Sequence, residues 1–145
     1  MVIIKLDYDK YFIEDINRFL SKNNFEYFDP HKNKSVENSL LGVVKDVYKG
    51  IYFNGELIAY GMLRGMDEGY STPMLGIAVD KRYEGIGVGK LLMQFLEVET
   101  KLLEYKEIKL RVHKDNIRAR NFYKKLGYKV VAKGTDIYTL RKFVW

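Results

Sequence analysis

The sequence predicts a mixed α/β (α+β) fold in a single domain over residues 1–145, with a central sheet of about seven strands flanked by about four helices. Short apolar and β-branched runs, typical of strands, are interspersed with longer stretches whose apolar residues recur at helical spacing. Turn-forming residues such as Asn54-Gly55 separate these segments. With 47% hydrophobic residues, a chain of 145 residues can bury a core without disulfides or a structural metal.

The N-terminal third is predicted to form a strand followed by two helices. Residues 2–6 are a β-branched run, and apolar side chains recur at helical spacing over residues 12–20. Residues 23–35 show no periodicity and predict a loop. A second helical pattern follows over residues 36–44, where we expect a wall of the active site.

The middle of the chain predicts a hairpin and a central strand. Residues 48–53 and 57–63 flank Asn54-Gly55, which tolerates the positive φ angles of a type I′ turn, so we expect an antiparallel hairpin. A polar, glycine-bearing loop over residues 64–73 leads into residues 74–79. Because this run is almost entirely apolar, we expect a strand that is buried on both faces.

A long helix and a further strand follow. Three glycines precede an amphipathic helix whose apolar positions run from Val88 to Leu102 and Leu103. Apolar residues then alternate over residues 108–112, as expected of a strand with one buried face.

The chain is predicted to end in a short helix and a hairpin. Asp115 or Asn116 can cap the helix, and Gly127 can end it in the left-handed conformation. Strands over residues 128–132 and 137–144 would then pair through the turn between them.

Composition restricts the possible chemistry. No apolar run approaches the ~18 residues of a membrane helix, and the N-terminus does not resemble a signal peptide, so we expect a cytoplasmic protein with no membrane partner. The chain has no cysteine, which removes disulfides, a thiolate nucleophile and the common zinc sites. The two histidines, His31 and His113, lie far apart in sequence, so no metal site is expected.

The net charge of +6 is unevenly distributed. Residues 1–100 carry 12 basic and 15 acidic side chains, whereas residues 101–145 carry 13 basic and 4 acidic ones. Such a basic segment favours an anionic partner, either nucleic acid or a small phosphorylated cofactor. A solvated lysine-rich helix face is the alternative interpretation.

The glycine-rich segment is a candidate anion site. Gly85, Gly87 and Gly89 let the backbone turn tightly before a helix, whose N-terminal N–H groups and dipole can bind a pyrophosphate. The P-loop pattern fails because Glu84 stands at its first glycine and Leu91 at its hydroxyl position. The Gly-x-Gly-x-Gly spacing also differs from the dinucleotide-binding pattern. A loop that merely requires small residues remains an alternative.

A second pattern lies downstream, where the sequence reads Asn116-Ile-Arg-Ala119-Arg-Asn-Phe122-Tyr123-Lys-Lys-Leu-Gly127-Tyr128. Together with the glycine loop, it resembles the GCN5-related N-acetyltransferase (GNAT) superfamily over about residues 74–130. The resemblance implies a GNAT fold in which the central parallel strands, residues 74–79 and 108–112, splay apart to admit acetyl-CoA. Glu84 departs from the Gln or Arg that usually opens the glycine motif. A carboxylate there would repel a diphosphate, so we expect it to point to solvent.

The resemblance also implies roles for individual residues. The strand would contact the thioester and pantetheine through its main chain, the loop would hold the pyrophosphate, and Asn116 and Tyr123 would contact the cofactor. The implied cofactor-binding set is Ile77, Ala78, Val79, Gly85, Ile86, Gly87, Val88, Gly89, Lys90, Asn116 and Tyr123.

The same family resemblance indicates candidates for the catalytic acid and base. Tyr123 falls on the family's tyrosine position, and a phenol that is protonated at neutral pH can protonate the departing thiolate. By helical spacing alone, it would be a core residue. Glu68 is the candidate base, although any single loop residue can equally be solvated surface. The implied acceptor-binding set is Arg64, Asp67, Tyr70 and His113.

These inferences predict an enzyme that moves an acetyl group from acetyl-CoA to a primary amine by direct attack in a ternary complex. The stretch from Leu63 to Tyr70 resembles acetyltransferases of surface-sugar biosynthesis and suggests an amino-sugar or another small metabolite. A peptide or protein amine, and a non-catalytic acyl-CoA-binding module, are the alternatives. Nucleic-acid binding is disfavoured because Phe122, Tyr123 and Tyr128 fit core spacing. Both a monomer and a homodimer remain open.

Overall fold

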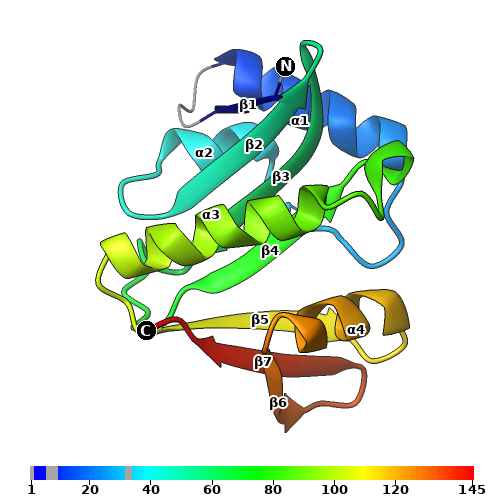
Figure 1. The fold of residues 1–145 in the computed structure, drawn as a ribbon. Coiled ribbons are helices and arrows are strands. Elements are labelled where there is room, and N and C mark those ends of the chain that lie inside the picture. The colour runs from blue at the N-terminus through cyan, green and yellow to red at the C-terminus, as the bar shows by residue number, and fades with distance from the viewer. Residues whose placement is uncertain (1, 6–9, 32–33) are drawn as a thin grey trace.

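The computed structural model describes residues 2–5, 10–31 and 34–145. Its sheet contains seven strands in the order β1-β2-β3-β4-β5-β7-β6 (Figure 1). The strands are β1 Val2–Lys5, β2 Val47–Phe53, β3 Glu56–Arg64, β4 Met74–Val79, β5 Glu107–His113, β6 Lys129–Lys133 and β7 Ile137–Phe143. The α-helices of this described part are α1 Lys10–Asn23, α2 Val36–Leu41, α3 Val88–Leu102 and α4 Ile117–Lys125. The predicted mixed α/β class is confirmed.

The first four strands form an antiparallel unit. Strands β2 and β3 are joined at Asn54 (φ 50°) and Gly55 (φ 77°), so the hairpin is confirmed and both turn residues have the positive φ of a type I′ turn. Of the predicted first strand, Leu6 lies outside the described residues. The second helix is shorter than predicted, because it ends at Leu41 and Gly42 follows as its C-cap.

Helices cover the two faces of the sheet differently. Helices α1 and α2 lie on one face beside β1–β3, whereas α3 and α4 lie on the opposite face (Figure 1). Helix α3 packs through Leu92, Met93 and Leu96, which are fully buried. The prediction that its apolar face continues to Leu102 and Leu103 is wrong: Leu102 is 72% exposed, because the helix ends there beyond the edge of the core.

The two central strands separate along their length. Strands β4 and β5 are parallel, but they pair only at Met74–Lys109 and Leu75–Leu110. Beyond these two pairs the strands diverge, as the expected splay requires. As predicted, strand β4 packs into the core on both faces, with Leu75 in one cluster and Ala78 in the other. Its remaining residues are only half-buried, because they border the gap.

The remaining strands continue the sheet past β5. Strand β5 pairs with β7, and β7 with β6, in antiparallel fashion. Asn116 caps α4 by accepting a hydrogen bond from the Ala119 N–H (3.3 Å), and Gly127 (φ 94°) follows the helix, as predicted. Within the described ranges, no helix is both long and apolar enough to cross a membrane.

Candidate active site

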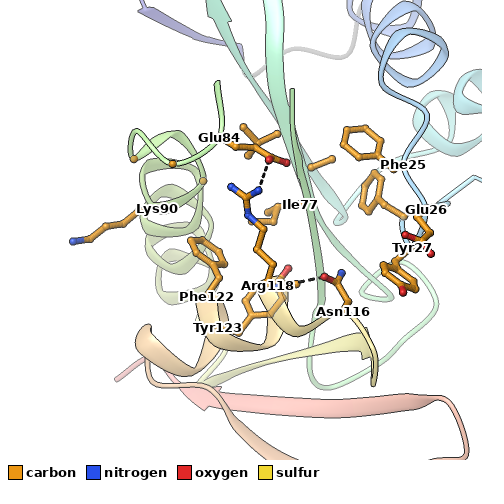
Figure 2. Close-up of a pocket in the computed structure, with 17 residues that line it drawn as sticks. Phe25, Glu26, Tyr27, Ile77, Glu84, Lys90, Asn116, Arg118, Phe122 and Tyr123 are labelled. Atoms are coloured by element: carbon orange, nitrogen blue, oxygen red, sulfur yellow. Dashed lines mark hydrogen bonds and ion pairs between the residues drawn. The ribbon is translucent and has the colours of Figure 1, made fainter. Parts of the chain in front are cut away.

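A cavity of about 470 Å³ occupies the region where β4 and β5 diverge (Figure 2). It brings together most of the predicted cofactor-binding residues: Ile77, Ala78, Val79, Gly85, Gly87, Gly89, Lys90, Asn116 and Tyr123. The predicted residues Ile86 and Val88 do not line it. Residues separated by almost 50 positions in the sequence thus meet around one space.

The backbone of β4 faces this cavity. The Asp80 N–H donates to the Ile58 carbonyl on β3 (2.7 Å). Because backbone groups of a strand alternate between its two neighbours, Ile77 and Val79 direct their N–H and C=O groups to the opposite side. On that side the pairing with β5 has already ended at Leu75. An extended ligand in the gap can therefore pair with β4 as a neighbouring strand does.

The glycine loop closes one end of the cavity. Gly85 (φ 78°) and Gly87 (φ 95°) adopt the left-handed conformation, and a Cβ at either position would meet only open space. Gly87 is also the N-cap of α3, and its carbonyl accepts a hydrogen bond from the Leu91 N–H (3.0 Å). The first N–H groups of the helix precede this bond and have no acceptor within the helix, which is the arrangement that binds anions.

Gly89 allows two helices to approach closely, and its backbone does not adopt a positive φ. A Cβ at Gly89 would lie 3.3 Å from the Phe122 ring, so a larger residue would push α3 away from α4. Lys90, by contrast, extends away from Ile77 and Tyr123 (Figure 2). The loop therefore presents backbone rather than lysine charge to the cavity.

Glu84 does not point to solvent as expected. Its Oε2 lies 2.6 Å from the Arg118 guanidinium, and both residues line the cavity. Figure 2 shows Arg118 reaching from α4 across the cavity toward Glu84. A cation in the first turn of a helix is unfavourable beside the positive end of the helix dipole. Glu84 compensates for this charge, and Arg118 in turn neutralises the carboxylate beside the glycine loop.

Tyr123 lies on α4 at the floor of the same cavity. Its side chain is buried against Phe122 and Tyr128, with ring centroids 5.4 and 5.8 Å away. Burial raises the pKa of the phenol well above its ordinary value. The Tyr123 ring thus packs in the core, as its helical spacing predicts, and the residue also lines the cavity with its phenol protonated.

The opposite wall of the cavity comes from a segment that sequence reasoning treated only as a loop. Residues 25–28, which follow α1, line the cavity with Phe25, Glu26, Tyr27 and Phe28. The Tyr27 ring stacks on His113 at 4.8 Å. The concentration of aromatic residues in this short stretch is the signal that could have identified it as a binding wall.

A second cavity of about 490 Å³ adjoins the first. Three of the predicted acceptor-side residues, Arg64, Glu68 and Tyr70, line it. Tyr27 and Phe28 line both cavities, so the two spaces meet at this aromatic wall. We call the first space the cofactor cavity and the second the acceptor cavity, after the roles that the sequence predicts for the residues lining them.

Two predicted acceptor residues do not line either cavity. The Asp67 carboxylate accepts hydrogen bonds from the backbone N–H groups of Val44, Lys45 and Asp46 (3.2, 2.7 and 3.0 Å). Although desolvation opposes ionisation, these bonds hold the pKa of Asp67 below its ordinary value. The His113 ring stacks on the Tyr27 ring, which lines both cavities. Both residues shape the walls.

The loop beneath the acceptor cavity also contains His31. Its Nδ1 lies 2.9 Å from the Ser39 hydroxyl, and its Nε2 is buried with no hydrogen-bond partner among the described residues. Burial, assisted by the Arg64 charge, lowers the pKa of His31 to about 4, so the ring is neutral at pH 7. Arg64 holds the same loop by donating to the Pro30 carbonyl (2.7 Å).

Comparison with known proteins decides the family. The model of the acetyltransferase (GNAT) family matches residues 10–128. The chain belongs to the GNAT family. It is an acetyl-CoA-dependent N-acetyltransferase, and the two adjoining cavities are its candidate active site.

This acetyltransferase is similar to several known proteins in sequence or in fold. A spermine/spermidine N(1)-acetyltransferase from Bacillus subtilis is 29% identical over 116 residues, which is 75% of each chain. The PaiA N-acetyltransferase from Thermoplasma acidophilum, solved with coenzyme A, superimposes with a TM-score of 0.78 over 99% of both chains at 18% identity. The ribosomal-protein-S18-alanine N-acetyltransferase from Escherichia coli gives 0.78 at 16% identity over 99% of this chain and 94% of its own.

Proposed function

We propose that this acetyltransferase moves the acetyl group of acetyl-CoA directly to a primary amine of a small molecule, with both substrates bound at once. The observation that carries the proposal is the pair of adjoining cavities that share Tyr27 and Phe28 as a wall. A thioester in one cavity and an amine in the other would meet near this wall. No covalent acetyl-enzyme is then required.

The cofactor cavity fits the parts of acetyl-CoA, which supplies the activated thioester. The loop amides of residues 85–90 would bind the diphosphate, since open left-handed glycines and the start of α3 lie there. The free edge of β4 at Ile77 and Val79 would pair with the pantetheine amides. Arg118 would add a cation beside the diphosphate once it leaves Glu84.

The acetyl transfer requires one proton to be delivered and one to be removed. The amine nitrogen attacks the thioester carbon, and the carbon–sulfur bond breaks. Tyr123 would give its phenolic proton to the sulfur, because burial keeps this group protonated at neutral pH. A backbone N–H of β4 would stabilise charge on the carbonyl oxygen, an effect typically worth about 3 kcal/mol in barrier.

Glu68 is the proposed base that takes the amine proton. It lines the acceptor cavity and forms no ion pair with any other described residue, so its carboxylate is available. Glu68→Gln should lower kcat/KM by about tenfold or more at neutral pH, with the loss shrinking as pH rises and the free amine increases. Asp67→Asn is the neighbouring control. Equal losses in both variants would assign a wall-shaping role to Glu68.

A substrate panel tests the function as a whole. Thiol release from acetyl-CoA is measured with spermidine, amino sugars and peptides with free N-termini. Turnover on a small amine supports the proposal, whereas turnover on peptides alone favours a protein acceptor. CoA binding without release on any amine would indicate a non-catalytic module. Trapping of an acetylated side chain during turnover would contradict direct transfer.

A further inference from the structure

The β5–β7–β6 end of the sheet has one face that none of the helices in the described part of the chain covers. Helices α1 and α2 lie beside β1–β3, and α3 and α4 lie on the other face (Figure 1). Along β5, the buried residues Ile108, Leu110 and Val112 point toward α3 and α4. Their alternates on β5, together with the side chains opposite them on β7 and β6, therefore form the open face.

Three cations lie in one row across this open face. Lys109 on β5 is directly opposite Arg141 on β7, and Arg141 is directly opposite Lys129 on β6. We call these three residues the cationic row. Directly opposed residues of antiparallel strands share a face, so the three side chains leave the sheet one strand spacing apart, about 4.8 Å.

Among the described residues, one anion, Glu107, forms an ion pair with one of the three cations of the cationic row. Glu107 lies 3.6 Å from Arg141, but it also accepts a hydrogen bond from the Thr72 hydroxyl (3.0 Å). Like charges directly opposite each other weaken a sheet. Lysine on the edge strand β6 can be explained as protection against edge pairing, but β5 and β7 are inner strands. An anionic ligand would compensate for the repulsion there.

The cationic row begins at the acceptor cavity. Lys109 lies in register with Met74, which lines that cavity. Arg111, the next residue on the same face of β5, is exposed and lines the cavity itself. A molecule whose amine enters the cavity can therefore extend its far end over the row.

We propose that the amine acceptor is a small molecule that carries a phosphate or diphosphate, which the cationic row binds while the amine enters the cavity. The inference rests on the proposed function and specifies its substrate. Two strand spacings, about 10 Å, match one or two phosphate groups rather than the long footprint of a macromolecule. The cationic row repels polycations. Spermine-like acceptors are therefore disfavoured, although one relative is a spermine/spermidine N(1)-acetyltransferase.

Binding to the row can be measured independently of catalysis. The enzyme is saturated with CoA, which occupies the glycine loop, and is then titrated calorimetrically with inorganic pyrophosphate. Lys109→Gln combined with Lys129→Gln leaves the Arg141–Glu107 pair in place and should weaken binding by about tenfold or more. Lys101→Gln with Lys125→Gln removes the same charge from the α3 and α4 side and should change nothing.

Turnover then tests the substrate class. Glucosamine 6-phosphate is compared with glucosamine, and phosphoethanolamine with ethanolamine, with spermidine as the polycation. The phosphorylated member of at least one pair should have a kcat/KM at least about tenfold higher, and the double Lys→Gln variant should lose that preference while Lys→Arg replacements restore it.

Specific results would overturn the inference. Pyrophosphate that fails to bind, or binds the double variant and the wild type equally, removes the row as an anion site even if amines are acetylated. A preference for spermidine, or for an acidic peptide over both phosphorylated amines, would assign another acceptor. Failure of every amine to release CoA, with row-dependent pyrophosphate binding intact, would contradict the proposed function instead.

Discussion

The cofactor cavity and the acceptor cavity share two aromatic side chains but are built from different materials. In the first, the edge of β4, the left-handed glycines and the start of α3 present backbone polar groups, and aromatic side chains complete the walls. The second consists of side chains such as Arg64, Glu68 and Arg111 from segments far apart in sequence. A site made of backbone suits one invariant cosubstrate, whereas a site made of side chains can change its acceptor without changing the fold.

The largest effect on cofactor binding is expected at the glycine loop. Gly87→Val places a β-branched residue at φ 95° where α3 begins, so the loop amides can no longer converge. CoA affinity measured by calorimetry should fall at least about a hundredfold. Gly42→Ala, at φ −95° with open space around it, should leave affinity unchanged. Normal CoA binding by Gly87→Val would refute the assignment of the loop.

Tyr123 tests whether the cofactor cavity also performs chemistry. Tyr123→Phe keeps the packing against Tyr128 but removes the proton donor, so kcat should fall about a hundredfold while the Kd for CoA stays within about twofold. Tyr138→Phe, outside both cavities, is the control. Unchanged turnover in Tyr123→Phe would rule out this residue as the acid.

The Glu84–Arg118 pair places side-chain charge beside the backbone amides of the glycine loop. Glu84→Gln removes the carboxylate that repels a diphosphate and frees the guanidinium, so CoA should bind several-fold more tightly. Pantetheine, which lacks phosphates, should bind as before. Glu104→Gln provides a control for net charge. If Glu84→Gln instead weakened CoA binding, the carboxylate would be positioning Arg118 rather than restraining it.

Because the pKa of His31 is lowered in the folded protein, we expect acid to reduce the free energy of unfolding. Its pKa falls from 6.5 to about 4 on folding, so the unfolded chain binds a proton more readily and stability is lost as pH falls from about 6.5 toward 4. Allowing for partial solvent exposure, the loss at pH 5 is about 1 kcal/mol. Urea unfolding at pH 7 and pH 5 should show this loss in the wild type and not in His31→Asn.

Sequence reasoning predicted the parts of the molecule that local rules determine. Asn54-Gly55 favours a particular turn, Asn116 can cap a helix only at its start, and the glycine spacing predicts the tight turn before α3. The glycine loop and the capped start of α4 follow from these features because each depends on residues adjacent in sequence.

The parts that escaped prediction depend on tertiary contacts. Glu84 meets Arg118 across 34 positions, and nothing near either residue indicates the pair. Asp67 serves a turn more than 20 residues away, although its neighbour Glu68 lines the cavity. Two adjacent carboxylates thus have different roles because the direction of each side chain is set by segments that meet only in the folded chain.

The short pairing between β4 and β5 has one further consequence. With only two residue pairs at its centre, the sheet has its fewest interstrand hydrogen bonds where a ligand enters. An extended ligand bonded to Ile77 and Val79 would act as an additional strand, so association would lengthen the secondary structure and not merely fill space. Amide hydrogens of these two residues should then exchange with deuterium far more slowly in the complex.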